Sequence, residues 1–360
     1  MADKIKIGIT QGDTNGIGYE VIIKALSDAR MLDICIPVVY GSSRFFGIHR
    51  KFIPETDQLA TNVINSAEDA RPKRINIINA VPESLAIEIG QPTADGAKAA
   101  ILALEAAAAD AEKGVIDAIV TAPINKHTVA EQGFGFPGHT EFFINKFGSD
   151  GTGLMLLCSA DSRIGIVTNH LPLSQISKNL TKDLILSKVR IMNKSLIHDF
   201  GYDRPKIALL SLNPHAGDGG SLGTEEIDVI TPAIEAAKEE GILAFGPYSP
   251  DGFFGTFAQR KFDGVLAMYH DQGLIPFKTL AFDGGVNYTA GLSIIRTSPD
   301  HGTGYDIAGK CMANPGSMIS AIYSAIDFCH NRRKYAEISA NPLEIKHFEG
   351  PRYERTIMPE

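Results

Sequence analysis

Short apolar runs and amphipathic stretches alternate along the chain, and they predict an alternation of strands and helices. The runs typical of buried strands are bounded by turn residues: 4–10, 116–121, 163–168, 206–212, 262–268 and 292–296. Helical patterns lie at about residues 18–26, 94–113, 141–147, 181–200, 224–241 and 315–331. Strands that alternate with helices of this length predict an α/β fold with mostly parallel sheets and helices on both faces.

The remaining segments are expected to be connections. The helix at 94–113 has Thr93 or Asp95 as its N-terminal cap and Gly114 as its stop. A loop rich in glycine and proline at 133–141 is the expected crossing into a second domain.

Four longer stretches complete this reading of the chain. Residues 31–80 are expected to hold two further strands separated by polar loops. Residues 283–291 and 297–310 are expected to be loops, and the tail after Pro342 to be loosely ordered.

Histidines follow three of the predicted strands. His170, His215 and His270 stand at or just beyond strand ends, where α/β proteins bind ligands. Three imidazoles with one open position would hold Zn²⁺ or a similar divalent ion. Their separations, 215 − 170 = 45 and 270 − 215 = 55 residues, match no local ligand motif. From spacing alone, unconnected surface histidines remain the alternative.

Other polar residues fall at the same predicted edge. Residues 269–278 are expected to form a loop that brings His270, Asp271 and Lys278 together. Arg296 follows an apolar run, where an unpaired guanidinium would be costly, so it is expected to meet an anion from protein or ligand. Asp251 lies in a turn and is free to face a site.

Two other features each allow two interpretations. Gly12, Gly16 and Gly18 follow the first strand, and they serve either a tight turn or contact with a ligand. Thr140 either caps a helix, with His139 on the surface, or both residues belong to a site.

Composition narrows the class of protein. The 360 residues allow two domains, and 44% hydrophobic residues with 21% charged residues are typical of a globular protein. The net charge of −8 and the absence of a dense basic cluster argue against a nucleic-acid partner. No apolar run approaches about 18 residues, so no membrane span is expected. The N-terminal residues alternate as in a strand and not as in a signal peptide.

The four cysteines predict a cytoplasmic location, because widely separated cysteines without metal or redox spacing are typical of thiols in a reducing compartment. They are Cys35, Cys158, Cys311 and Cys329.

Five motifs together resemble the 4-hydroxythreonine-4-phosphate dehydrogenase family of vitamin B6 synthesis, in the same order from about residue 5 to about 330. They are 137–142, 169–173, 212–217, 269–274 with Lys278, and 295–298 with 300–303. The resemblance implies that His170, His215 and His270 bind a divalent metal (Zn²⁺, Mg²⁺, Mn²⁺ or Co²⁺). It implies substrate contacts by His139, Thr140, Lys278, Asn287 and Arg296. In the first loop the chain departs from the family, which usually has Pro in place of Tyr19.

The family has the two-domain fold of the isocitrate and isopropylmalate dehydrogenases. The resemblance therefore implies a first domain of residues 1–130 plus 300–360, a second of residues 131–299 with the metal site and dimer interface, and a cofactor cleft between them. It implies a homodimer with shared sites, in which His270 of one chain completes the metal site of its partner.

A second likeness concerns the cofactor. Residues 301–310 with Asn314 resemble the adenine-binding loop of the isopropylmalate dehydrogenases. This implies a cofactor site of His301, Gly302, Thr303, Asp306 and Asn314. A carboxylate at Asp306 that faces the ribose favours NAD over NADP.

By family analogy, the reaction is NAD-dependent oxidation of 4-phosphohydroxy-L-threonine with loss of CO2, giving 3-amino-2-oxopropyl phosphate. Lys278 is a candidate base, and Asp271 and Asp251 are candidates for orienting metal ligands or a water. Two alternatives remain, a dehydrogenase of 4-phosphorylated threonate or erythronate and a redox-free metalloenzyme acting on a phosphorylated substrate.

Overall fold

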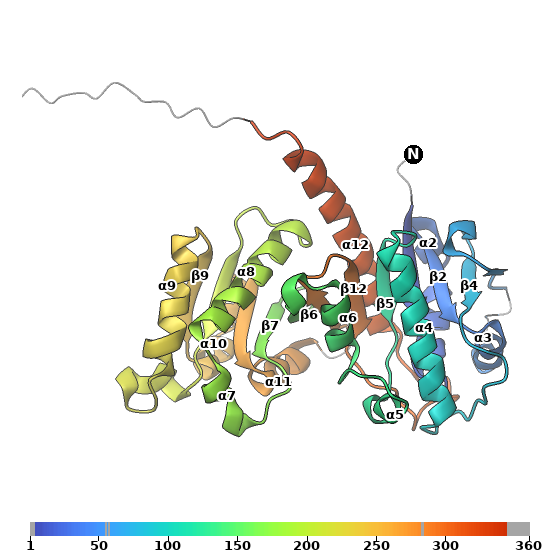
Figure 1. Cartoon of the computed structure of the whole chain (residues 1–360), viewed down its shortest axis with the longest axis horizontal. Helices are drawn as coiled ribbons and strands as arrows, with labels where there is room; N and C mark the ends of the chain where they lie inside the picture. The colour runs from blue at the N-terminus through green and yellow to red at the C-terminus, as the bar shows by residue number, and fades with distance from the viewer. Residues whose placement is uncertain (1–3, 55, 57, 282–283, 344–360) are drawn as a thin grey trace, which may run out of the picture.

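The chain forms an elongated α/β molecule built on one sheet (Figure 1). The computed structural model describes residues 4–54, 56, 58–281 and 284–343. Its strands are β1 Ile5–Thr10, β2 Cys35–Gly41, β3 Thr61–Ile64, β4 Ile75–Asn79, β5 Ala118–Thr121, β6 Leu154–Cys158, β7 Arg163–Thr168, β8 Lys206–Leu210, β9 Leu243–Tyr248, β10 Gly264–Tyr269, β11 Val286–Ala290 and β12 Ile295–Pro299. Among the described residues they form a single sheet in the order β3-β4-β2-β1-β5-β12-β11-β6-β7-β10-β8-β9.

The sheet consists of two parallel blocks joined by antiparallel strands. Neighbours from β3 to β12 and from β7 to β9 are parallel, whereas the pairs β12–β11, β11–β6 and β6–β7 are antiparallel. Because three antiparallel pairs separate the blocks, the two blocks run in opposite directions. The expected α/β class with a mostly parallel sheet is confirmed.

Helices cover both faces of this sheet. They are α1 Gly18–Leu26, α2 Ala29–Ile34, α3 Ser43–Arg50, α4 Ala94–Glu112, α5 Lys126–Glu131, α6 His139–Phe147, α7 Leu173–Asn179, α8 Lys182–His198, α9 Thr231–Glu239, α10 Pro250–Gly255, α11 His270–Ala281 and α12 Gly316–Ser339. In the part of the chain that is described, no helix is long and apolar enough to cross a membrane.

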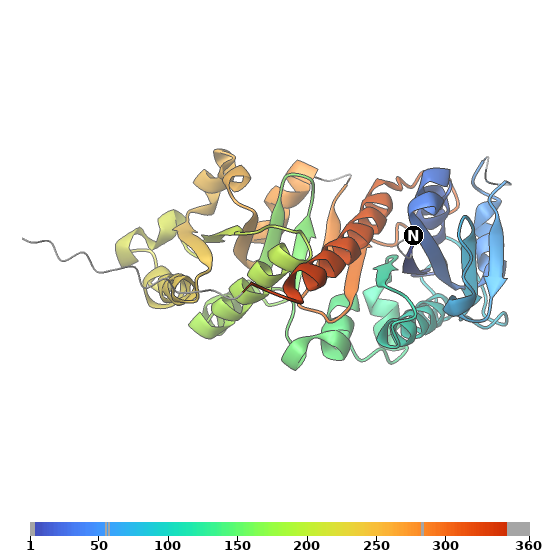
Figure 2. The ribbon, with the colours of Figure 1, turned by 90° about the horizontal axis from the view of Figure 1, so that it is seen from above.

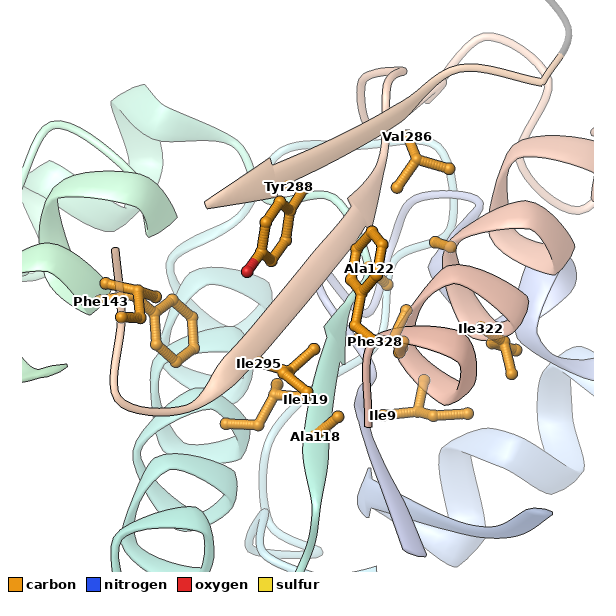
Figure 3. Packing of buried hydrophobic residues seen from close by; sticks show 14 of the residues in the cluster. Ile9, Ala118, Ile119, Ala122, Phe143, Val286, Tyr288, Ile295, Ile322 and Phe328 are labelled. Atoms are coloured by element: carbon orange, nitrogen blue, oxygen red, sulfur yellow. The ribbon is translucent and has the colours of Figure 1, made fainter. Parts of the chain in front are cut away.

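The central strands carry different helices on their two faces. The Thr297 hydroxyl donates to the Ala321 carbonyl of α12 at 2.8 Å, so α12 covers one face. Neighbouring residues of a strand point to opposite faces, and the Arg296 guanidinium lies 5.6 Å from the Phe143 ring of α6 on the other side. Figure 3 shows this separation, with Phe143 on one side of β12 and Phe328 on the other.

Helix α12 also joins the last part of the described chain to the second parallel block. Seen from above, it lies obliquely across the middle of the molecule beside α8 (Figure 2), and Tyr335 stacks on His198 at 3.8 Å. The buried Asp199 carboxylate accepts hydrogen bonds from Tyr288 Oη of β11 at 2.5 Å and from Arg332 Nε of α12 at 2.6 Å. These bonds connect α8, β11 and α12.

Local signals explain several of these elements. Thr93 caps α4 by accepting from the Gly96 amide at 3.1 Å, as one of the two expected caps, and Gly114 ends this region with φ +70°. Strands β1, β5 and β7 are almost entirely buried, which matches their apolar runs.

Five sequence predictions were wrong in detail. Residues 31–80 contain three strands instead of the expected two. The strand β3 was missed because it is half-exposed and lacks an apolar run. Residues 270–278, expected as a loop, belong to α11 despite Gly273 and Pro276.

The other three corrections concern the end of the chain. Much of the expected loop 283–291 is the strand β11, and the strand expected at 292–296 lies at Ile295–Pro299. The final helix continues to Ser339 instead of ending near 331. Residues 282–283 and the tail from 344 lie outside the described residues. The division into domains 1–130 plus 300–360 and 131–299 stays a prediction, and the sheet is continuous across it through the β5–β12 pair.

Candidate active site

A cleft of about 330 Å³ opens on the face of the central strands that is turned away from α12. Its floor carries Arg296 on β12 and Asn287 on β11, and further lining residues come from β5, β6, α5, α6 and α11 and from the segments that follow β5, β7 and β12. Nine of the residues predicted from sequence line this one cleft: His139, Thr140, His170, His270, Lys278, Asn287, Arg296, His301 and Gly302.

Arg296 is a buried cation at the floor. Its two terminal nitrogens donate to Thr289 Oγ1 at 3.1 Å and Thr121 Oγ1 at 2.7 Å. Its Nε is buried without a hydrogen-bond partner, and no carboxylate of the described residues pairs with the guanidinium. Burial lowers the pKa of Arg296 to about 9, so the group stays charged at neutral pH. The charge of Glu141 acts on Arg296 without forming an ion pair with it, so this position favours an anionic ligand.

His139 and Thr140 begin α6 at the wall of the cleft. Gly138 occupies the N-cap position and no side chain caps the helix. The alternative of Thr140 as a cap with His139 on the surface is therefore wrong. His139 Nε2 is buried without a partner. Burial, followed by the charges of Arg296 and Lys126, holds the pKa of His139 well below its usual value, so its imidazole is neutral.

His170 and His270 lie next to each other in the cleft. They follow β7 and β10, which pair in parallel with Thr168 opposite Tyr269, and this register places the two rings 5.9 Å apart. His170 Nδ1 lies 3.2 Å from Glu141 Oε1, and His270 Nδ1 lies 2.7 Å from Asp271 Oδ1. Carboxylates at Nδ1 leave Nε2 of each imidazole available as a metal ligand.

His215 lies in a neighbouring hollow of about 600 Å³, together with Asp251 and Asp271. After β8 the chain turns away, because Glu226 Oε1 accepts from the amides of Leu212 and Asn213 at 2.8 Å each. Among the described residues no three of His, Cys, Asp or Glu are grouped as metal ligands. The role of His215 as a metal ligand stays a prediction.

Asp251 is held beside His215. Its Oδ1 accepts from Ser249 Oγ at 2.7 Å. This hydrogen bond, the Gly252 amide and the charge of His215 lower the pKa of Asp251.

Lys278 reaches the cleft from the last turn of α11. Its Nζ lies 3.8 Å from Asp300 Oδ2, and the Asp300 carboxylate is only 17% exposed. Burial raises the pKa of Asp300, although the charge of Lys278 opposes this.

The predicted cofactor segment runs from the cleft towards the first loop. Thr303, Asp306 and Asn314 line neither hollow. The Ile17 amide donates to the Thr303 carbonyl at 2.9 Å, and Tyr305 Oη donates to Asp13 Oδ2 at 2.6 Å.

The backbone conformation of Gly12 and the close contact at Gly16 require glycine in the first loop. Gly12 has φ +69°, and a Cβ at Gly16 would lie 2.5 Å from the Thr303 carbonyl oxygen. The contact between this loop and a ligand, which the sequence left open, stays a prediction.

Three charged residues of the cleft were missed as site residues: Lys126, Glu141 and Asp300. Glu141 and Asp300 lie within recognised motifs, at 137–142 and 300–303, whereas Lys126 follows β5 outside all five motifs. The position of Lys126 and Asp300 shortly after strand ends could have identified these two as site residues.

Comparison with known proteins gives a consistent result. Residues 33–325 match the family described as pyridoxal phosphate biosynthetic protein PdxA. The 4-hydroxythreonine-4-phosphate dehydrogenase of Bacteroides thetaiotaomicron is 48% identical over 347 residues, which cover 96% of this chain and 95% of the relative. A Cutibacterium acnes protein, provisionally named D-threonate 4-phosphate dehydrogenase, is 40% identical over 327 residues and covers 89% of this chain and 93% of its own length.

A solved structure agrees over a similar extent. The crystal structure of 4-hydroxythreonine-4-phosphate dehydrogenase from Klebsiella pneumoniae superposes with a TM-score of 0.79 at 35% identity. The match covers 91% of this chain and all of that chain.

Proposed function

Because the chain belongs to the pyridoxal phosphate biosynthetic protein PdxA family, we propose that it is the dehydrogenase of 4-phosphohydroxy-L-threonine. In this reaction the substrate hydroxyl is oxidised by NAD and the resulting keto acid loses CO2 to give 3-amino-2-oxopropyl phosphate. The family makes it an oxidoreductase that uses a nicotinamide cofactor. What we propose beyond the family is the preference for NAD over NADP and the identity of the substrate.

One observation carries this proposal. Arg296 is a buried, unpaired cation in a cleft that also holds the facing imidazoles of His170 and His270. A phosphorylated, carboxylated substrate supplies the anion that Arg296 lacks, and a planar guanidinium can bind such an oxyanion through two hydrogen bonds. The orphaned Asn287 Oδ1 and His139 Nε2 provide further polar contacts on the same floor and wall.

Two imidazoles of the cleft support the proposal of a divalent metal. His170 and His270, with Nδ1 held by Glu141 and Asp271, would hold it together with His215. Bound there, Zn²⁺, Mg²⁺, Mn²⁺ or Co²⁺ supplies a Lewis acid that lowers the pKa of the substrate hydroxyl. His301 and Gly302, followed by Thr303, Asp306 and Asn314, would hold the dinucleotide next to the cleft.

The protein's own groups would bind and orient the substrate. Arg296 and Lys278 hold its anionic groups, and the neutral His139 can share a hydrogen bond without adding charge. Lys278 is also the proposed base, and in this role its ammonium group would first pass a proton to the Asp300 carboxylate, which lies 3.8 Å away. Asp271 orients His270, and Asp251 orients His215 or a water.

We further propose a homodimer with shared sites. In this arrangement His270 of one chain completes the metal site of its partner, as in the family. Within one chain His170 and His270 already lie together and His215 lies in the next hollow. Mixing of histidine variants tests which imidazole reaches the metal site of the partner chain.

Absorbance at 340 nm tests the reaction. The chain is mixed with NAD and 4-phosphohydroxy-L-threonine, and in parallel with 4-phospho-D-threonate. We expect NADH from the first substrate at a kcat/KM at least about tenfold above that of the second, which corresponds to about 1.4 kcal/mol. If the chain prefers 4-phospho-D-threonate, as the name of the Cutibacterium relative would suggest, then that acid, which has no amino group, is the substrate. If neither of these two acids nor 4-phosphoerythronate gives NADH, the remaining alternative is a redox-free metalloenzyme.

Chelation tests the metal. Extensive dialysis against a chelator should reduce turnover to background, and added Zn²⁺, Mg²⁺, Mn²⁺ or Co²⁺ should restore it, because no protein cation replaces a Lewis acid at the hydroxyl. Direct binding of Co²⁺, followed by its visible absorption, should be lost in His170→Ala and His270→Ala. Full activity of the metal-free chain would contradict the proposed three-histidine site.

A further inference from the structure

The charges of the cleft are unequally neutralised. Arg296 and Lys126 lack an ion-pair partner among the described residues, whereas Lys278 lies 3.8 Å from Asp300. The second carboxylate, Glu141, contacts His170. The remaining imidazole on the wall, His139, is neutral.

A phosphate monoester carries about −1.5 to −2 charges at pH 7. Arg296 alone would leave part of this charge uncompensated on a largely buried floor, where uncompensated charge is costly. Lys278 contributes little net charge because Asp300 is its neighbour. Among the described residues of the cleft, Lys126 is the remaining cation without an ion-pair contact, although the Glu141 carboxylate acts on it through its charge.

The position of Lys126 supports a role in the cleft. It is the first residue of α5, where a positive charge is unfavourable to the helix dipole. The helix start is already capped by Asn125, whose Oδ1 accepts from the His127 amide at 3.0 Å. The charge of Lys126 therefore does not serve the helix.

The side chain of Lys126 extends along the first turn of α6. A Cβ built on Gly138 would lie 3.3 Å from Lys126 Cε and 3.4 Å from Glu141 Oε2. Its charge acts on both neighbours, since it helps to lower the pKa values of His139 and Glu141. Lys126 is thus exposed at the open side of the cleft, next to the wall that faces Arg296.

We propose that Lys126 is a substrate-binding residue that contacts the substrate's phosphate from the α5 side, opposite Arg296. The inference rests on the proposed function for the identity of the substrate. It makes the phosphate subsite a pair of cations on different elements, one fixed in the sheet and one at the end of a flexible side chain. The ligand class is a phosphate monoester of a small hydroxy acid.

Three variants test the proposal: Lys126→Met, which keeps length and removes charge, Lys126→Arg, and Lys98→Met on the exposed side of α4 as a matched control. Binding of 4-phosphohydroxy-L-threonine and 4-phosphothreonate to the metal-loaded protein is measured by calorimetry without cofactor. We expect Kd for both acids to rise about tenfold in Lys126→Met, to recover to within about threefold in Lys126→Arg, and to stay unchanged in Lys98→Met. The Lys126→Met variant should also show a shallower dependence of Kd on salt.

Turnover adds the second comparison. The KM for the phosphorylated substrate should rise in Lys126→Met, with the KM for NAD unchanged. An unchanged Kd, or a rise confined to the KM for NAD, would overturn the assignment. Calorimetric binding is independent of redox chemistry, so a weaker Kd in a protein that forms no NADH would uphold Lys126 while refuting the proposed reaction. A wild-type protein that binds neither phosphorylated acid would overturn both.

Discussion

At the scale of single residues, the sheet floor is built for a ligand more than for its own stability. Arg296 is 2% exposed, and its hydrogen bonds go to two threonine hydroxyls instead of a carboxylate. Burial of an unpaired guanidinium opposes folding, and its lowered pKa expresses the same cost. An anion in the cleft would remove this cost at the moment of binding.

Replacement of Arg296 by methionine should therefore separate binding from stability. We expect kcat/KM for the phosphorylated substrate to fall at least about a hundredfold, because a charge-assisted pair is lost. The free energy of unfolding should stay within about 1 kcal/mol of wild type or rise, since the buried charge disappears along with two hydrogen bonds. Urea denaturation and initial rates measure the two effects. A variant that unfolds easily but keeps its KM would contradict this account.

Asp306 governs a second residue-scale prediction. We expect a kcat/KM for NAD at least about tenfold above that for NADP, because a 2′-phosphate would bring about two negative charges towards the Asp306 carboxylate. Lys310 Nζ donates to the Asp306 carbonyl at 2.7 Å, so this cation is held at the backbone, close to the carboxylate it could offset.

The preference should narrow in Asp306→Ala, whereas Lys310→Met should widen it. Steady-state rates with both cofactors provide the measurement. Equal use of NAD and NADP by the wild type would mean that Asp306 caps a turn and does not face the ribose.

At the scale of elements, sequence patterns predicted the strands that are buried and apolar. The strand ends that carry His170 and His270 were predictable because β7 and β10 are apolar runs followed by polar residues. The strand β11 was missed because residues 283–291 contain three glycines and a polar, partly buried Asn287. Helix α11 was missed because Gly273 and Pro276 are typical of loops, although burial of Phe277 against the sheet stabilises the helix.

Contacts between distant segments could not be predicted from local pattern. The neighbourhood of Lys126, Glu141 and Asp300 arises only when α5, α6 and the end of β12 meet over the central strands. The separation of His215 from His170 likewise depends on the Glu226 contacts that redirect the chain after β8.

The cap of α4 yields a prediction at this scale. Thr93 Oγ1 accepts from the Gly96 amide and also from Asn15 Nδ2 at 2.8 Å, so it secures both the helix and the first loop. We expect Thr93→Ala to lower the free energy of unfolding by about 1 to 2 kcal/mol.

The matched control is Thr181→Ala, which removes only the exposed cap bond to the Leu184 amide of α8 and should cost less, about 0.5 to 1 kcal/mol. Thr93→Ser should retain most of the stability. Equal losses at the two caps, measured by urea denaturation, would show that the Asn15 contact adds nothing.

At the scale of the whole molecule, the assembly can be tested by mixing variants. If His270 completes the partner's metal site, inactive His170→Ala and His270→Ala chains that are unfolded and refolded together should recover about a quarter of wild-type activity. This follows because half of randomly paired dimers are mixed and each mixed dimer keeps one intact site.

The same experiment has an informative alternative. If His170 and His270 of one chain act together, as their 5.9 Å ring separation allows, that mixture stays inactive and His170→Ala with His215→Ala recovers activity instead. Sedimentation should show dimers in each case. A fully active monomer would contradict the shared site.

The floor and the walls of the cleft differ in how freely they can change over evolution. Arg296 and Asn287 stand on strands that pair with a neighbouring strand on each side, so a shift at either would propagate through the sheet. The walls are the ends of α5, α6 and α11, which contact the floor through side chains. Changes at these helix ends could therefore alter which acid binds while Arg296 and Asn287 stay in place.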